Sequence, residues 1–162
     1  MVAHSLRHLL EGHLGSNDAL LKIDFRNAFN LIDRNAFVRA VCEKFPALSQ
    51  WTYWCYGSPR VLLYDHELVI NSTRGVQQGD PLGPLYFCCG IANLVGKIQE
   101  FNPRYNKWYM DDGGICTEEK LVAIWRLLLG RKSEAGLRTQ SAKVLAGAQV
   151  HQTVPYPRSW WR

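Results

Sequence analysis

The sequence predicts an α+β fold in which a small antiparallel sheet has helices packed on one face. Apolar and polar residues alternate over residues 19–25, which is typical of a half-buried strand. Two further strand-like stretches flank Asp-Asp-Gly-Gly at residues 111–114, which is typical of a hairpin turn. Apolar residues recur at helical intervals in the segments after residues 33, 80 and 117, which predicts three helices. With 162 residues, 47% of them hydrophobic, the chain is expected to form one globular domain.

Residues 1–18 are predicted to form an N-terminal helix, a remnant of a neighbouring subdomain, ahead of the main domain at residues 19–150. The histidines of this helix are better interpreted as a solvated face than as a metal site. Residues 151–162 show no periodicity and are expected to form a loosely held tail.

The first predicted strand points Leu21, Ile23 and Phe25 to one face and Lys22 and Asp24 to the other. A carboxylate in a strand is unfavourable by propensity, and it is costly if it is buried without a partner. Asp24 is therefore a candidate functional residue.

After a turn at residues 27–32, Asp33 is expected to cap a helix that Pro46 ends. The next feature is an aromatic cluster, which is usually core, although exposed clusters stack nucleic-acid bases. Its members are Trp51, Tyr53, Trp54 and Tyr56. Residues 61–64 and 68–71 are predicted to form a hairpin.

Residues 74–84 contain three glycines and two prolines, which predicts a tightly shaped loop whose amides approach a ligand closely. Asp80 with Pro81, or with Pro84, is expected to begin the next helix. The loop lacks the Lys-Ser/Thr end of a nucleoside-triphosphatase phosphate loop, so that function is excluded.

The hairpin around Asp111 and Asp112 has two interpretations. Acidic residues at a turn are often solvated and idle. The second interpretation is that the two acidic residues are held rigidly at a functional site. It is favoured by the bulky neighbours Trp108, Tyr109 and Met110, which hold the turn against a packed sheet. Two rigidly held carboxylates repel each other unless a cation lies beside them. With Asp24 as a third carboxylate, the sequence predicts a divalent-metal site.

The C-terminal part of the main domain is predicted to contain a helix capped by Thr117, followed by a last pair of strands at residues 136–140 and 143–145. The net charge of +5 weakly favours a polyanionic partner. Five cysteines without a Cys-x-x-Cys pair favour a reducing compartment. The expected location is intracellular, in the nucleus or cytoplasm, because no signal core or membrane span is evident.

Four segments resemble motifs of reverse transcriptases in the order that this family uses. Residues 22–30 (Lys-Ile-Asp-Phe-Arg-Asn-Ala-Phe-Asn) resemble motif A, and residues 75–84 resemble motif B. Residues 109–112 (Tyr-Met-Asp-Asp) resemble motif C, and Gly136-Leu137 followed by Lys143 is similar to motif D. The residues of motifs A and B are most similar to those of non-LTR (LINE-type) retrotransposons.

The resemblance implies a palm subdomain and nucleotidyl transfer to a primer 3′-hydroxyl. It implies that Asp24 and Asp111 hold two Mg²⁺ ions, with Mn²⁺ as a substitute, and that Asp112 supports the site. Lys143 would protonate the leaving pyrophosphate. The partners implied are an RNA template, a DNA primer and deoxynucleoside triphosphates.

Further residues are implied to lie along the incoming nucleotide. They are Phe25, Asn27, Ala28, Phe29, Gln78 and Gly79. Phe29, five residues after Asp24, matches the family's steric gate, a ring that clashes with a ribose 2′-hydroxyl.

The sequence also departs from the family. Gly83 stands where many relatives have Ser, and Gln140 where motif D usually has Asn. The resemblance covers residues 19–145, so a palm fragment is expected, whose fingers and thumb another chain would supply. Weak or absent activity in isolation follows from that expectation, because positioning accounts for much of phosphoryl-transfer catalysis.

Two alternatives to a catalytic palm stay open. The first is a relic or domesticated fragment whose sheet only binds nucleic acid. The second, an unrelated RNA-recognition module, would carry aromatic residues on its sheet face in place of three aspartates, and it ranks last.

Overall fold

The computed structural model describes residues 11, 17–64, 68–129, 135–137 and 139–146, in two compact units. The sheet unit comprises residues 1–26, 97–130 and 138–162, and the helical unit comprises residues 27–96 and 131–137. The predicted domain boundaries stay a prediction. The predicted N-terminal helix and tail lie almost entirely outside the described residues.

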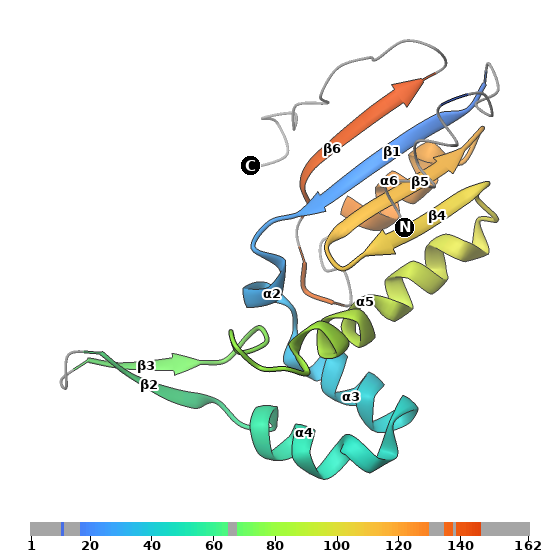
Figure 1. Cartoon of the computed structure of the whole chain (residues 1–162). Helices are drawn as coiled ribbons and strands as arrows, with labels where there is room; N and C mark the ends of the chain where they lie inside the picture. The colour runs from blue at the N-terminus through green and yellow to red at the C-terminus, as the bar shows by residue number, and fades with distance from the viewer. Residues whose placement is uncertain (1–10, 12–16, 65–67, 130–134, 138, 147–162) are drawn as a thin grey trace. The chain divides into compact units, whose positions relative to one another are not determined.

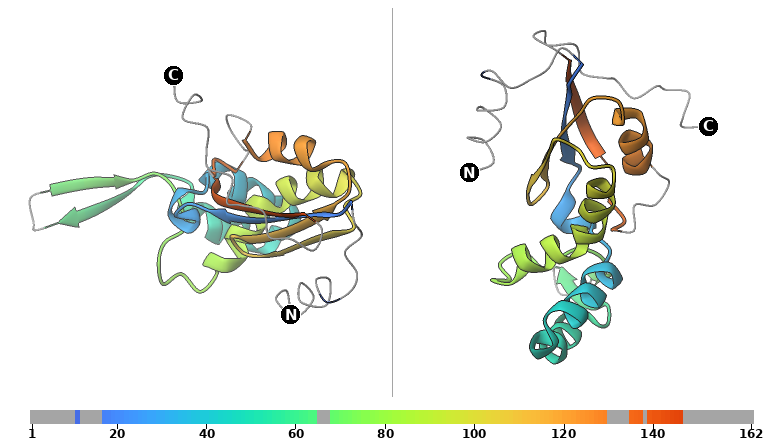
Figure 2. Two further views of the ribbon diagram at one scale, coloured as in Figure 1. Left: turned by 90° about the horizontal axis from the view of Figure 1, so that it is seen from above. Right: turned by 90° about the vertical axis from the view of Figure 1, so that its right-hand side faces the viewer.

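The sheet unit is built on a four-stranded antiparallel sheet with the strand order β4-β5-β1-β6. Helix α6 lies against one face of this sheet (Figures 1 and 2). The elements are β1 (Ala19–Phe25), β4 (Tyr105–Tyr109), β5 (Asp112–Thr117), α6 (Leu121–Leu129) and β6 (Thr139–Ala146). This is the predicted α+β architecture.

Strand β1 has the predicted alternation. Leu21, Ile23 and Phe25 are buried, whereas Lys22 is exposed and Asp24 is half-buried. The buried set lies on the face to which β5 contributes Ile115, because directly paired residues share a face. Burial of this face fixes the register, since a slip of one residue would expose the apolar set.

The helical unit combines helices with a two-stranded hairpin. Its elements are α2 (Ala28–Leu31), α3 (Arg34–Lys44), the 3₁₀ turn η1 (Pro46–Leu48), α4 (Ser49–Tyr56), β2 (Arg60–Tyr64), β3 (Leu68–Ser72) and α5 (Gly83–Glu100). The last residues of α5, from Lys97, belong to the sheet unit. Asp33 caps α3 as predicted, and its side chain accepts a hydrogen bond from the Asn35 amide at 2.8 Å.

The core of the helical unit is centred on three aromatic rings. Tyr56 meets Phe37 edge-on at 5.1 Å and Tyr86 at 5.3 Å, and the rings of Phe37 and Tyr86 stack at 5.6 Å. The predicted aromatic core cluster is thus only partly correct. Of its members only Tyr56 is buried, whereas Trp51, Tyr53 and Trp54 are exposed, because they lie on the outer side of α4.

Four local predictions differ from the structure. The region of residues 27–32, predicted as a turn, contains the short helix α2. Thr117 ends β5 and does not cap a helix. The predicted final strand pair is a single strand, β6, because it pairs with β1 along the whole length of β1.

The fourth difference concerns the acidic hairpin. Its turn consists of Met110 and Asp111, whereas Asp112, Gly113 and Gly114 belong to β5. The reason is packing, because a Cβ on Gly113 would lie 2.5 Å from the Trp108 ring. Gly113 is needed beneath an aromatic ring in the sheet and not in the turn.

No helix among the described residues is both long and apolar enough to cross a membrane.

Candidate metal and nucleotide site

The sheet face that carries Asp24 changes character along its strands. Register places Leu20, Cys116 and Tyr105 in one row across β1, β5 and β4, and all three are buried. Lys22, Gly114 and Lys107 form the next row, with both lysines exposed. Asp24, Asp112 and Tyr109 form the last row. The face therefore passes from apolar to basic to acidic within five residues of β1.

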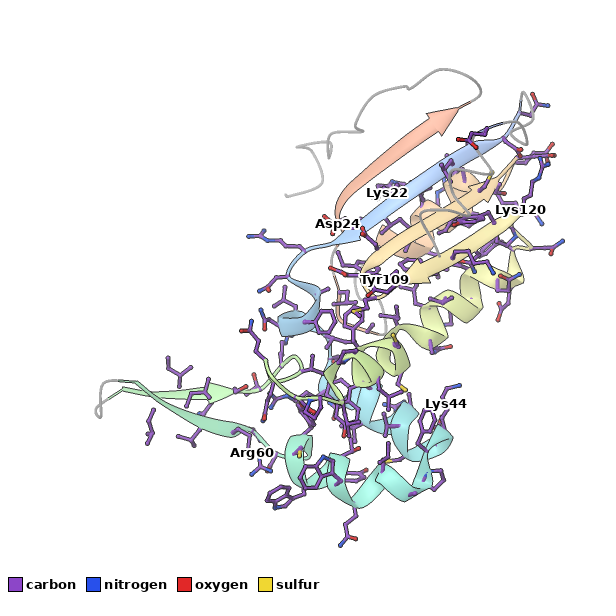
Figure 3. The ribbon with its side chains drawn as sticks, viewed as in Figure 1. Lys22, Asp24, Lys44, Arg60, Tyr109 and Lys120 are labelled. Carbon is purple, nitrogen blue, oxygen red and sulfur yellow. The ribbon has the colours of Figure 1, made fainter. Side chains whose placement is uncertain are left out.

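The acidic row brings the three predicted carboxylates together. Asp24 is the direct register partner of Asp112, and Asp111 immediately precedes Asp112 in the hairpin turn. Met110 makes this turn with a φ of 53°, in the left-handed region that few residues with a side chain adopt. Figure 3 labels Asp24 at the end of β1 and Tyr109 at the end of β4, with β5 between these two strands.

The turn stands on a packed aromatic support. On the opposite face of the sheet, Trp108 stacks on Phe25 with centroids 5.8 Å apart. Its indole N–H donates to Asn106 Oδ1 at 2.8 Å, so the half-buried ring keeps a hydrogen-bond partner. The acidic residues are therefore held on a rigid element.

Burial and like charge together shape the electrostatics of this site. Burial, followed by the carboxylates of Asp111 and Asp112, raises the pKa of Asp24, and Lys22 opposes this rise. Lys22 Nζ lies 3.9 Å from Asp112 Oδ1, with both side chains more than half exposed, so this ion pair is weak. The repulsion among the carboxylates is only partly compensated within the chain.

The side chains do not form a ready-made metal centre. Within the described part of the chain, no three His, Cys, Asp or Glu side chains are grouped so that they could hold a metal ion. The carboxylates nevertheless offer the hard oxygen ligands that Mg²⁺ prefers. Their mutual repulsion is also what a cation between them would relieve.

Strand β6 borders the acidic row on the other side of β1. Lys143 pairs in register with Lys22, and Ser141 pairs with Asp24. The register shifts between Asp24 and Phe25, where β6 contains one extra residue, Gln140. Lys143 thus lies one register row from Asp24, and its role stays a prediction.

The remaining predicted nucleotide residues are divided between the units. Phe25 belongs to the sheet unit and is buried. The others belong to the helical unit, where Asn27 has a φ of 46° and Ala28 is buried. Phe29 is half-buried and stacks on Phe87 at 4.5 Å.

The motif B loop is joined to the end of motif A within the helical unit. The Val76 amide donates to the Phe29 carbonyl at 2.8 Å, and the Gly75 amide donates to the Ile32 carbonyl at 2.9 Å. Gln78 and Gly79 lie on the exposed part of this loop, and Gly79 has a φ of 87°. The loop thus presents the two predicted residues to solvent.

Two supporting residues of this loop were not predicted from sequence. Arg34 donates from Nη1 to the Ser72 carbonyl at 2.6 Å and from Nε to the Gly75 carbonyl at 2.9 Å. The Tyr56 hydroxyl donates to Asp80 Oδ2 at 2.5 Å and accepts from the Gln77 amide at 3.1 Å. Backbone partners this distant along the chain leave no residue pattern, so sequence offered no signal for Arg34.

The family profile described as "Reverse transcriptase (RNA-dependent DNA polymerase)" matches residues 3–154. The chain belongs to this family. Its curated relatives come from retrotransposable elements, as the residues of motifs A and B predicted. The resemblance seen in the four motifs is thereby confirmed.

Two relatives among curated proteins are retrotransposon proteins. The retrovirus-related Pol polyprotein from the type-1 retrotransposable element R2 of Nasonia vitripennis is 26% identical over 147 residues. That alignment covers 84% of this chain and 13% of the relative. The retrotransposable element SLACS 132 kDa protein of Trypanosoma brucei gambiense is 32% identical over 101 residues, covering 58% of this chain and 8% of that protein. The chain therefore spans a small part of each relative.

The fold is similar to solved telomerases. Apo telomerase from Candida tropicalis superposes with a TM-score of 0.67 at 12% identity, over 90% of this chain and 32% of that one. The same enzyme in complex with a TWJ fragment of telomeric RNA gives 0.64 at 11% identity, over 89% of this chain and 28% of that one. The predicted fold class, a reverse-transcriptase palm-like sheet with helices, is confirmed.

Proposed function

We propose that this chain supplies the palm of an RNA-directed DNA polymerase, which transfers a deoxynucleotide to a primer 3′-hydroxyl on an RNA template. The observation that carries the proposal is the register pairing of Asp24 with Asp112 beside Asp111. Together with the raised pKa of Asp24, it marks a place where the fold tolerates carboxylate repulsion.

Asp24 and Asp111 are the proposed ligands of two Mg²⁺ ions, or of Mn²⁺ in their place, with Asp112 as a supporting carboxylate. Bound ions would favour ionisation of the primer hydroxyl and neutralise charge on the leaving pyrophosphate. Asp112 is ion-paired with Lys22 in the structure, so its carboxylate would exchange one cation for another if it supported a metal ion.

The other residues would bind and orient the nucleotide. The Phe29 ring is fixed by stacking on Phe87, which suits a rigid steric gate against a 2′-hydroxyl. Gln78 and Gly79, with backbone groups of Phe25, Asn27 and Ala28, would lie along the nucleotide. Lys143 would donate a proton to the leaving pyrophosphate.

We expect the isolated 162-residue chain to extend primers weakly or not at all. Well-oriented reactants gain about 7–11 kcal/mol in such reactions, and that gain requires both primer and nucleotide to be fixed. A net charge of +5 is modest for holding a template–primer duplex at physiological salt. The lack of a ready-made metal group among the described residues favours the alternative of a non-catalytic nucleic-acid-binding fragment.

Metal-dependent stabilisation separates these two functions without requiring turnover. Mg²⁺ at about ten times its Kd should stabilise the folded chain by about 1.4 kcal/mol. Thermal unfolding is measured with Mg²⁺ and with EDTA, for the wild-type chain and for Asp111→Asn. The matched control is Glu119→Gln, which removes an exposed carboxylate of the sheet unit away from the acidic row.

We expect Mg²⁺ to raise the Tm of the wild-type chain and of Glu119→Gln, and to leave Asp111→Asn unchanged. Primer extension by the wild-type chain, however weak, should require Mg²⁺ and disappear in Asp111→Asn. Equal Mg²⁺ responses in all three proteins would reject the metal site and leave the non-catalytic alternative.

A further inference from the structure

The helical unit contains a cleft of about 760 Å³ between α4, the base of the β2–β3 hairpin and the motif B loop. Its lining residues combine arginines, amides, one exposed indole and a few apolar side chains. The residues that the argument uses are Trp54, Arg60, Arg74, Gln77 and Gln78. A cleft of this size accommodates a small-molecule-sized group such as a nucleotide.

The charge of the cleft has one sign. Arg60 and Arg74 line it, and no Asp or Glu does so among the described residues. Arg60 donates from Nε to the Cys55 carbonyl at 3.2 Å, which fixes the guanidinium at the base of the hairpin (Figure 3). Within the described part of the chain, neither Arg74 nor the terminal nitrogens of Arg60 have a hydrogen-bond or ion-pair partner. Both cations are therefore available to a polyanion.

An exposed aromatic ring lies beside these cations. Trp54 is 65% exposed, and its ring packs against that of Trp51 with centroids 5.0 Å apart. The Arg60 guanidinium carbon lies 6.0 Å from the centroid of the Trp54 ring. An exposed, fixed indole next to arginines is a suitable platform for a nucleic-acid base and its phosphates.

We infer that this cleft binds single-stranded nucleic acid, with a base stacked on Trp54 and the backbone phosphates on Arg60 and Arg74. The amides of Gln77 and Gln78 line the same cleft and offer hydrogen bonds to base edges. A single strand is favoured because only an unstacked base can lie on the indole. The inference deepens the proposed function, on which it rests, by assigning a site to a strand of the substrate.

A protein partner is the competing occupant. The hairpin exposes apolar side chains, among them Leu62, which also lines the cleft, and Leu63, at 53% and 74%. Burial of those side chains would favour a protein or a second copy of this chain. The charge of the cleft favours nucleic acid instead, because an interface built on Leu62 and Leu63 does not require two arginines without carboxylate partners.

The test is binding of a short, unstructured, fluorescently labelled RNA to the full chain, measured by anisotropy in EDTA. Trp54→Ala should weaken binding by roughly 5- to 160-fold, the loss expected for one stacked base. Arg74→Gln should lower the slope of log K against log salt by about 0.7, the value for one phosphate contact on a single strand. A photoreactive uridine in the RNA should crosslink to Trp54. A DNA single strand of the same sequence and a duplex competitor show which nucleic acid is preferred.

Matched variants make the outcome specific. Tyr53→Ala removes an aromatic ring of the same helix that is 59% exposed and does not line the cleft. Arg39→Gln removes an exposed arginine of α3 that is also outside the cleft lining. Neither should change the affinity or the salt slope by a comparable amount. Circular dichroism confirms folding, and since Trp54 and Arg74 are both exposed, each variant tests the inference by itself.

The inference is overturned if Tyr53→Ala weakens RNA binding as much as Trp54→Ala, or if neither cleft variant changes it. It is also overturned if the wild-type chain self-associates in sedimentation velocity, Trp54→Ala and Leu63→Ser abolish that association, and RNA binding is unaffected. Asp111→Asn separates this result from the proposed function. Retained RNA binding at the cleft without any Mg²⁺ response would reject the polymerase function and support the cleft site. A Mg²⁺ response that Asp111→Asn abolishes, without RNA binding at the cleft, would support the polymerase function and reject the cleft site.

Discussion

The two units of this chain differ in the groups that surround a charged side chain removed from solvent. In the helical unit, Arg34 is 6% exposed and donates hydrogen bonds to two backbone carbonyls and to the Ser72 hydroxyl. The Tyr56 ring lies 5.4 Å from its guanidinium carbon. In the sheet unit, burial and two further carboxylates raise the pKa of half-buried Asp24. The first charge is satisfied by fixed oxygens, whereas the second is opposed by like charge.

This difference separates a structural charge from a functional one. The oxygens around a buried cation keep their hydrogen-bond donors only while the cation is present. Removing the cation leaves these buried acceptors unpaired, which destabilises the fold. A carboxylate among carboxylates weakens the fold unless a ligand compensates, and such groups are concentrated at functional sites. The prediction is that removing Arg34 harms the fold and that removing the charge of Asp24 does not.

The largest expected effect is that of Arg34→Met. This substitution keeps much of the side-chain volume but leaves the carbonyls of Ser72 and Gly75 without their donors, and it should lower the free energy of unfolding by about 3 kcal/mol. Urea unfolding measures the loss. Arg39→Met, on the exposed side of the same helix, is the control and should change stability by less than about 0.5 kcal/mol. Similar losses in both variants would show that the hydrogen bonds of Arg34 contribute little.

Gly75→Ala should have the next largest effect, because Gly75 supplies one of the carbonyls that hold Arg34. Its φ is 72°, and a Cβ there would lie 2.5 Å from the backbone of Asn30, which cannot rotate away. We expect a loss of about 2–3 kcal/mol in urea unfolding. Gly79→Ala shares the positive φ but has no atom within 4 Å of the added Cβ, so it should lose only about 1 kcal/mol. A loss at Gly79 as large as that at Gly75 would mean that the positive φ, and not the contact with Asn30, causes the destabilisation.

Sequence reasoning found the acidic site more readily than its supports. The alternation in β1 placed Lys22 and Asp24 opposite the buried residues, because a period of two is a local property. The position of the hairpin turn was wrong because Gly113 meets Trp108 across the sheet, and this contact depends on strand pairing. The same limit applies to Arg34, whose bonds reach residues 38 and 41 positions away.

The cleft of the helical unit was likewise predicted only in part from the sequence. The aromatic cluster was noted with two outcomes, core or base stacking, and the structure divides it, with Tyr56 buried and Trp54 exposed. Helix periodicity did not decide this, since α4 is short and aromatic on several sides. Arg60 and Arg74 become neighbours of one cleft only when the hairpin folds back.

The smallest expected effect has the opposite sign and concerns Asp24→Asn. Burial, then Asp111 and Asp112, raise the pKa of Asp24 above its ordinary value of 3.8, so the folded chain retains a proton that the unfolded chain has already lost. The resulting stabilisation is fully present below pH 3.8 and is lost as the pH rises through the folded pKa. At neutral pH the ionised carboxylate therefore weakens the fold.

Asp24→Asn removes that repulsion and should increase the free energy of unfolding at neutral pH by less than about 1 kcal/mol, because the site is partly solvated. Urea unfolding in EDTA from acidic to neutral pH should show the difference from the wild-type chain growing as the pH rises. Glu119→Gln should follow the wild-type chain throughout, since that carboxylate is exposed. Mg²⁺ should reverse the order of stability by stabilising only the chains that keep Asp24. An Asn variant less stable than the wild-type chain in EDTA at neutral pH would mean that the Asp24 carboxylate has favourable partners, and the contrast with Arg34 would no longer hold.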